Sequence, residues 1–366
     1  MEKSTGKIGI REYVAIIILV VGVKLSDDTP AILVEPLASA YWMAPLISGI
    51  LSFIPIYLMI KVITFYKNKN LHDCILHLFG KYIGNCLSTI LLLFGVCALI
   101  IDSAAYVDII GTMYFNQSPK IMIYAVLMTA SAYIAKRGLE HIGSISWLVL
   151  FYLLISLFVA LLFSLQDGNG YFLFPIFGPS VWDVIKVSTS HVSIYADFFF
   201  LGLIAPYIVS AKAFKKGTMI GLGTVSILLC FSFLTYLFVF DYEGLKMVNY
   251  PFHELIRLVR LGFLTNVETF FFPFWVIATF IRFSFYLYLI ALFMGGIFNI
   301  KNFEYLIPTI ATIIPIIGMV PEAPTFTIFA LRDTLLEIIS PVFLIFPCLM
   351  WLIAKLKGEF RHDKAN

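Results

Sequence analysis

Charged side chains within long apolar stretches are the residues of this sequence with the clearest chemical potential. Asp102, Asp197 and Arg282 each lie inside such a stretch, and Lys24 and Asp27 lie where the first stretch is interrupted. A charge at the centre of a bilayer costs at least about 3 kcal/mol on insertion scales, so each needs a partner or a water-filled cavity. The guanidinium of arginine suits a carboxylate ligand, and an aspartate suits an amine or a proton.

These charges are open to two interpretations. In the first, Arg282 anchors the carboxylate of a ligand, and Asp102 and Asp197 bind its amine or a proton. In the second, the charges have structural roles. Arg282 pairs with Asp197 or Asp102, or its side chain snorkels to an interface, and Lys24 pairs with Asp27 or Asp28.

Helical spacing adds uncharged polar groups to the same faces. Ser190, Ser193 and Asp197 stand at i, i+3 and i+7, which puts them on one stripe of a helix. Tyr106 follows Asp102 by four residues and Tyr286 follows Arg282 by four, so each pair shares a face. Three apolar stretches therefore present polar faces to one interior, whereas the Tyr and Phe stripes elsewhere are more typical of packing or lipid contact.

The first apolar stretch is expected to be broken. It stops at residues 24–30, Lys-Leu-Ser-Asp-Asp-Thr-Pro, and then resumes. Pro30 removes a backbone donor and disfavours helix at the preceding residue. Unpaired backbone at membrane depth must line a cavity or be buried in protein, so this segment supplies four ligand-binding candidates: Gly22, Lys24, Ser26 and Asp27. The alternative is a short helix ending at Lys24, with both aspartates in the external headgroup region.

Motifs for catalysis, metal binding and cofactor binding are missing from the sequence. The six histidines form no H-E-x-x-H or H-x-x-H arrangement, and there is no phosphate loop or nucleophile elbow. The five cysteines have no C-x-x-C spacing and are expected to be packing thiols. We therefore predict a protein that is not an enzyme and that holds neither a metal nor a cofactor.

Composition determines the elements that must position these side chains. Of 366 residues, 61% are hydrophobic and 13% are charged, whereas soluble domains carry about 25% charged residues. This excludes a soluble globular domain, a disordered tail and a nucleic-acid module. We predict an all-α integral membrane protein.

Ten apolar stretches are candidate transmembrane helices. They cover residues 9–36, 42–65, 83–110, 119–135, 142–165, 185–209, 218–240, 266–298, 303–319 and 334–355. The first is predicted to be a helix rather than a cleaved signal peptide, because the A-x-A sequence Ala38-Ser39-Ala40 lies beyond the charged break.

The basic residues indicate the orientation. Alternate loops hold 17 of the 25, including Lys3, Lys67, Arg361 and Lys364, which predicts that both termini are cytoplasmic. The opposite loops are assigned Lys120, Lys186, Lys246, Arg257, Arg260 and Arg332.

A Gly/Pro-rich loop at residues 166–182 divides the single membrane domain, 1–366, into repeats at 8–165 and 185–356. Five spans in each half force opposite orientations, as in inverted-repeat transporters whose first and sixth helices are discontinuous. The break in the sixth span is predicted from its polar run at 188–197, which contains neither Gly nor Pro.

Several short segments resemble one membrane protein family in their order and spacing. They are Leu173 to Gly178, Asn249-Tyr250-Pro251, Glu268-Thr269-Phe270, Trp275-Val276-Ile277 and Tyr286-Leu287-Tyr288. The chain resembles the spore germination permeases over essentially its whole length. These are the B subunits of endospore germinant receptors, a branch of the amino acid–polyamine–organocation superfamily.

The resemblance implies broken first and sixth helices around a small-molecule germinant, typically an amino acid. It also implies a membrane A subunit and a lipoprotein C subunit as partners, in the inner membrane of the spore. Many relatives have a G-x-G-like break, whereas this chain has Gly22-Val23-Lys24, so Lys24 replaces the exposed amides, the ligand differs, or the site is degenerate. An amino-acid transporter coupled to protons or ions is the main alternative function, and a structural scaffold for the receptor is another.

Overall fold

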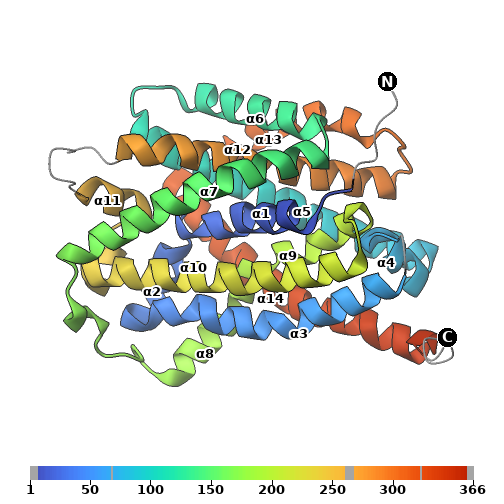
Figure 1. Cartoon of the computed structure of the whole chain (residues 1–366), viewed down its shortest axis with the longest axis horizontal. Coiled ribbons are helices and arrows are strands. Elements are labelled where there is room, and N and C mark those ends of the chain that lie inside the picture. Colours follow the sequence, from blue (N-terminus) through green and yellow to red (C-terminus); the bar gives the residue numbers. More distant parts are fainter. Residues whose placement is uncertain (1–6, 67–68, 260–267, 322–323, 361–366) are drawn as a thin grey trace.

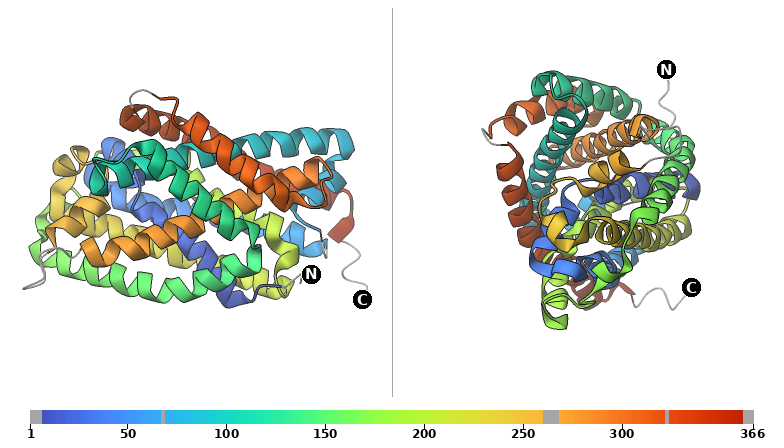
Figure 2. Two further views of the ribbon diagram at one scale, coloured as in Figure 1. Left: turned by 90° about the horizontal axis from the view of Figure 1, so that it is seen from above. Right: turned by 90° about the vertical axis from the view of Figure 1, so that its left-hand side faces the viewer.

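The computed structural model describes residues 7–66, 69–259, 268–321 and 324–360, and these form a bundle of helices (Figure 1). The described part contains no strand, only an isolated bridge between Ile8 and Ile208. The start of α1 and the end of α14 lie at the same end of the bundle (Figures 1 and 2). The α-helices are α1 (Ile10–Val21), α2 (Thr29–Leu37), α3 (Ala44–Phe65), α4 (Leu71–Phe79), α5 (Lys81–Ile109), α6 (Lys120–Lys136), α7 (Leu139–Ser164), α8 (Val181–Ser190), α9 (Asp197–Phe200), α10 (Ala211–Lys246), α11 (Pro251–Leu258), α12 (Glu268–Ile297), α13 (Leu306–Gly318) and α14 (Pro324–Leu356).

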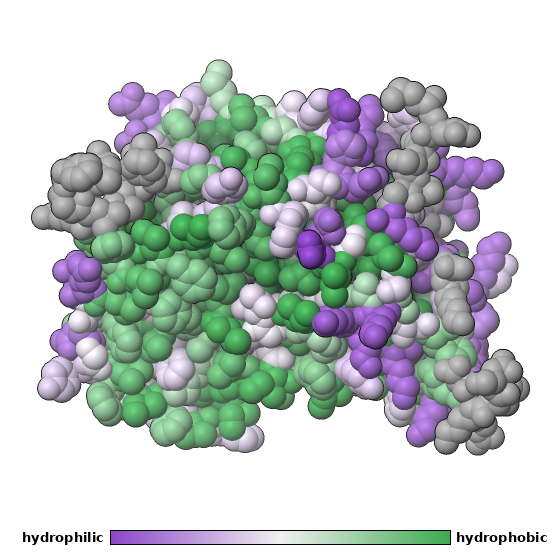
Figure 3. Space-filling view, viewed as in Figure 1, coloured by the Kyte–Doolittle hydropathy of each residue, from purple (hydrophilic) through white to green (hydrophobic). Residues whose placement is uncertain are grey.

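The surface of the bundle is suited to lipid. Hydrophobic residues cover the middle of the face in Figure 3, and hydrophilic residues gather towards its ends. Helix α7 illustrates the reason, because it exposes Leu148, Phe151, Ile155 and Leu162 while burying other apolar residues on its opposite face. A helix that is apolar all round belongs in a membrane or a deep core. The protein is a multi-pass membrane protein.

The number of spans is where sequence and structure differ. Within the described ranges, six helices are long and apolar enough to cross a membrane, or seven if the bent pair 181–190 and 192–207 is one span. Each of the ten predicted stretches contains helix, but α1, α6 and α13 have only 12, 17 and 13 residues. The count of ten is therefore not confirmed. Five basic residues used for the predicted orientation lie outside the described residues: Lys3, Lys67, Arg260, Arg361 and Lys364.

The break in the first stretch is present where Pro30 predicts it. Helix α1 ends at Val21, a 3₁₀ turn η1 covers Gly22–Leu25, and α2 begins at Thr29 with Pro30 in its first turn. Asp27 and Asp28 are both 0% exposed. The segment therefore lies inside the bundle, and its depth relative to the headgroup region stays a prediction.

The polar run at 188–197 also interrupts its helix. Helix α8 ends at Ser190, the 3₁₀ turn η6 covers Val192–Tyr195, and α9 is followed by a second 3₁₀ segment, η7 (Leu201–Tyr207). The two parts of the span meet at a bend of 47°. Side-chain hydrogen bonding favours this break: Ser193 Oγ donates to the Leu336 carbonyl of α14 at 2.6 Å.

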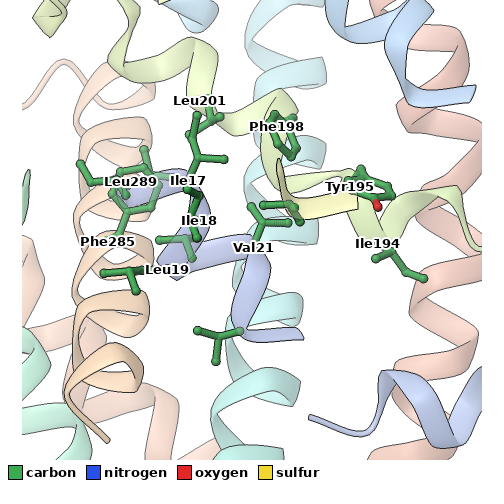
Figure 4. Packing of buried hydrophobic residues seen from close by; sticks show 14 of the residues in the cluster. Ile17, Ile18, Leu19, Val21, Ile194, Tyr195, Phe198, Leu201, Phe285 and Leu289 are labelled. Atoms are coloured by element: carbon green, nitrogen blue, oxygen red, sulfur yellow. The ribbon is translucent and has the colours of Figure 1, made fainter. Parts of the chain in front are cut away.

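Helix α1 lies in the centre of the bundle, which is why its break is deep. It packs against α10, α7 and α12, and all of its residues from Ala15 to Val21 are buried. Figure 4 shows Ile17, Ile18 and Leu19 of α1 close to Phe285 and Leu289 of α12.

Candidate functional site

A cavity lies beside the two breaks. It is bounded by α5, the η6–α9 segment, α12 and α14, and Lys24 reaches it from η1. The space measures about 820 Å³ when its open mouth is included. Its polar lining comes from Lys24, Asp102, Ser193, Asp197, Tyr286 and Arg332, and the remaining lining is apolar.

Lys24 joins the two broken segments across this cavity. Its Nζ lies 2.5 Å from Asp197 Oδ2 and donates to the Ile194 carbonyl, also at 2.5 Å. Tyr286 donates to the other oxygen, Oδ1, of Asp197 at 2.7 Å. The sequence left open a pairing of Lys24 with Asp27 or Asp28. The structure differs, because Lys24 pairs with Asp197 while both of those aspartates pair with Arg332.

Arg282 lies behind the cavity wall. It is 0% exposed, pairs with Asp102 Oδ2 and donates to the Val20 carbonyl of α1. Its guanidinium also faces the rings of Tyr106 and Tyr286, with centroid distances of 5.4 and 5.2 Å. The ion pair with Asp102 is one of the two pairings that the sequence left open.

Arg332 is the important residue that the sequence prediction misplaced. It was assigned to an external loop, but it is 4% exposed and lies on α14. Its Nη2 is 2.5 Å from Asp27 Oδ2, while Nη1 pairs with Asp28 and lies 3.4 Å from Asp102 Oδ1. The apolar residues just before Arg332 were the available signal, because a final span begun a few residues earlier than 334 would have included it.

Together these groups form a buried charge cluster, which we define as Lys24, Asp27, Asp28, Asp102, Asp197, Arg282 and Arg332. Its formal sum over these described residues is −1, from three cations and four carboxylates. Asp28 makes an ion pair with Arg332 but accepts no hydrogen bond from any described group. Charged groups taken out of water need partners to compensate the lost hydration. The excess of one carboxylate over the cations is therefore a distinctive property of the cluster.

Side chains from other helices also satisfy the backbone of the break. Ser26 Oγ donates to the Val23 carbonyl at 2.7 Å and accepts from Trp275 Nε1 at 2.8 Å. Two further carbonyls receive side-chain donors, Val20 from Arg282 and Leu25 from Tyr236, and Tyr106 is a second donor to the Val23 carbonyl. Such partners are what non-helical backbone requires inside a membrane.

The sequence candidates are therefore only partly brought together. Lys24, Asp102, Ser193, Asp197 and Tyr286 line the cavity, whereas Asp27, Tyr106 and Arg282 support it from behind. Gly22 and Ser26 line a different, smaller hollow beside Trp275.

Ser190 does not join the cavity. It lies before the bend, hydrogen bonds to the Val187 carbonyl and His191, and lines a pocket that also contains Asp333 and Glu337. The predicted stripe of Ser190, Ser193 and Asp197 assumed one continuous helix, and the interruption at His191 separates its first member from the others.

A second polar group, missed from the sequence, closes the bundle near the end of α5. Asp108 is 1% exposed, lies 2.5 Å from Lys120 Nζ and accepts from the Tyr250 hydroxyl at 2.6 Å. Tyr250 precedes α11, whose His253 Nδ1 is 2.8 Å from the Tyr114 hydroxyl. Burial lowers the pKa of His253 to about 3, so this imidazole is neutral. Helix α11 thus packs against the bundle through an uncharged contact between His253 and Tyr114.

Among the described residues no group of three or more His, Cys, Asp or Glu side chains is arranged to hold a metal ion. The arrangement instead offers paired charges of both signs around a partly open cavity, next to two interrupted helices. Such sites in transporter folds bind small charged solutes.

Comparison with known proteins identifies the family. Residues 11–327 match the spore germination protein family of permeases. The chain belongs to this spore germination permease family. A relative is spore germination protein KB of Bacillus subtilis (strain 168), which is 22% identical over 379 aligned positions covering 100% of this chain and 98% of the relative. The family resemblance predicted from the sequence is confirmed.

Proposed function

We propose that this permease is the B subunit of a germinant receptor and that it senses a small nutrient at the charged end of the cavity. The nutrient carries an ammonium and a carboxylate group, as an amino acid does, and its binding triggers germination. The argument rests on the hydrogen-bonding capacity that the cavity leaves unused.

That capacity matches such a head group. Lys24 has three N–H donors, of which two are used by Ile194 and Asp197. Asp102 Oδ2 accepts a hydrogen bond from Arg282, while Asp102 Oδ1 lies 3.4 Å from Arg332 Nη1. Nη1 of Arg332 forms an ion pair with Asp28, but it makes no hydrogen bond of good geometry to a described group. A ligand ammonium fits Asp102 Oδ1, and a ligand carboxylate fits Lys24 and Arg332.

The proposed architecture is two inverted repeats of five helices, at 8–165 and 185–356, with both termini cytoplasmic. Helix in each of the ten predicted ranges supports it, as do the interruptions at 22–28 and 191–196. A membrane A subunit and a lipoprotein C subunit are the proposed partners in the spore inner membrane, on the strength of the family resemblance. Affinity purification of the tagged chain from spore membranes tests them, because both subunits should co-purify.

Binding measurements with the purified full chain in nanodiscs test the sensing site. We expect an amino acid to bind, and Lys24→Met and Asp102→Asn to weaken binding at least tenfold each. Lys186→Met and Asp167→Asn are matched controls, because both residues are exposed and outside the cavity. Unchanged affinity in both cavity variants would refute the assignment of the head-group site.

An amino-acid transporter coupled to protons or ions is the second candidate, favoured by the charged cavity between two broken helices. Uptake of a radiolabelled amino acid into vesicles that contain only this chain would support it. Loss of germination on deletion of the gene, without any uptake by such vesicles, supports the sensor. Normal germination in both Lys24→Met and Asp102→Asn spores, with the receptor still assembled, would instead indicate a scaffold.

A further inference from the structure

The walls of the cavity differ sharply from its charged end. Beyond Asp102 and Arg332 the lining is apolar on all four sides. It comprises Leu92, Phe94 and Leu99 of α5, Phe200 of α9, Leu289 and Phe293 of α12, and Leu336 and Ile339 of α14.

A second hollow continues this apolar surface. It measures about 300 Å³ when its open mouth is included, and it shares Phe94, Ala196, Phe200 and Ile339 with the first. The shared residues make the two hollows one groove, which extends along α14 to Phe343 and Phe346. We call this part of the site, from Phe94 to Phe346, the apolar groove.

The polarity of the groove determines what can occupy it. A polar group moved from water into such a groove loses its hydrogen bonds to water without replacement, which is unfavourable. An apolar group gains free energy there in proportion to the surface it buries. A molecule held by its head at the charged end must therefore extend an apolar body into the groove.

We propose that the ligand is a zwitterionic amino acid with a large apolar side chain, of the size of leucine, methionine or phenylalanine, and that the apolar groove is its side-chain subsite. This inference rests on the proposed function for the head group. Charge complementarity favours an amino acid over a lipid acyl chain, because the charged end of the cavity presents the Asp102 carboxylate together with Lys24 and Arg332. A fatty acyl chain has no ammonium for Asp102.

The experiment compares side chains on a constant head group. Competition against radiolabelled leucine is measured on the full chain in nanodiscs with alanine, phenylalanine and asparagine. Leucine has three more carbons than alanine, and at about 0.8 kcal/mol for each buried carbon it should bind up to about 60-fold more tightly. Asparagine, similar in size to leucine but polar, should bind at least as weakly as alanine.

Variants of the groove test its role independently. Ala196→Leu fills the groove where its two parts join, so the ratio of leucine to alanine affinity should fall at least tenfold. Ile339→Ser should lower the same ratio, because it places a hydroxyl on the groove wall. Ile338→Ser is the matched control, since its neighbouring side chain is 50% exposed on the outside of α14 and the ratio should not change.

The outcomes separate this inference from the proposed function. Equal affinity for leucine, alanine and asparagine would overturn the apolar subsite while leaving the amino-acid head site in place. Failure of every amino acid to bind would overturn both. A co-purified lipid that occupies the groove, identified by native mass spectrometry and not displaced by leucine, would also overturn the subsite.

Discussion

The buried charge cluster should respond much more strongly to the loss of a cation than to the loss of a carboxylate. Arg332→Gln leaves two cations among four carboxylates, and it removes the partner of Asp27 and Asp28. Removing one member of a buried ion pair costs about 3–5 kcal/mol because the other charge is left uncompensated. We expect Arg332→Gln to lower the free energy of unfolding by this amount.

Asp28→Asn should be much milder. It brings the formal charge of the cluster to zero, and the side chain that it replaces accepts no hydrogen bond from a described group. Arg332 keeps Asp27 at 2.5 Å and Asp102 at 3.4 Å. We expect a cost below about 1 kcal/mol, within the range of ordinary substitutions.

The assay is reversible unfolding of the purified chain in mixed detergent micelles, with the two single variants and the double variant Arg332→Gln/Asp28→Asn. The double variant should recover about 1–3 kcal/mol relative to the sum of the singles, as contacting residues do. Arg137→Gln is the control for loss of an arginine, because Arg137 is exposed and its side chain donates to the Tyr133 hydroxyl on its own helix. If Asp28→Asn costs as much as Arg332→Gln, or if the two costs simply add, the charge-balance reasoning is refuted.

Two further predictions concern helix packing and pH. Gly221→Ala should destabilise the fold by about 1–3 kcal/mol, because the added Cβ would lie 2.6 Å from Ile17 Cγ2 of α1. In the control Gly223→Ala the added Cβ meets nothing within 4 Å, so this variant should be neutral or stabilising. Equal effects of the two variants on the melting temperature would contradict this prediction. The pKa of His253 is about 3 in the folded protein and about 6.5 in the unfolded chain. The contribution of the neutral imidazole to the free energy of unfolding is therefore complete well above pH 6.5 and declines as the pH falls. The wild type should lose about 1 kcal/mol between pH 6.5 and 5.5 relative to His253→Gln, and a stability gap that stays constant or widens at low pH would exclude this linkage.

Local chemistry made the first break predictable from the sequence. Pro30 and the charges before it act on the backbone within a few residues, and no knowledge of the fold is needed to expect an interruption there. The burial of Asp27 follows from the same run, since it continues directly into the apolar segment of α2. The resemblance to the spore germination permeases was likewise visible, because it depends on the order of short segments along the chain.

Predictions that required a continuous helix were less successful. The stripe from Ser190 to Asp197 loses its first member because the chain turns at His191. The count of spans suffers for the same reason, since the break leaves α1 with only 12 residues. Helical periodicity holds only between breaks, and the sixth stretch contains neither Gly nor Pro at its break to mark it.

Pairing partners were the hardest feature to predict, because they depend on which helices meet. Lys24 and Asp27 are three residues apart, yet they pair with residues 173 and 305 positions away in the sequence. The predicted start of the last span at residue 334 places Arg332 in a loop, whereas α14 includes it.

The pairing also divides the cluster by role. Arg282 is fully buried, donates to the Val20 carbonyl and pairs with Asp102. Asp27 accepts from the backbone N–H of Thr29 at 2.8 Å and pairs with Arg332. These residues therefore stabilise the break itself. Lys24, Asp102 and Arg332 instead reach the cavity lining with bonding capacity unused. Because Asp102 and Arg332 each belong to both sets, a ligand that binds them competes with contacts that hold the broken helix. In the proposed receptor, binding at the cavity would therefore be coupled to the conformation of the break, which is what a sensor requires.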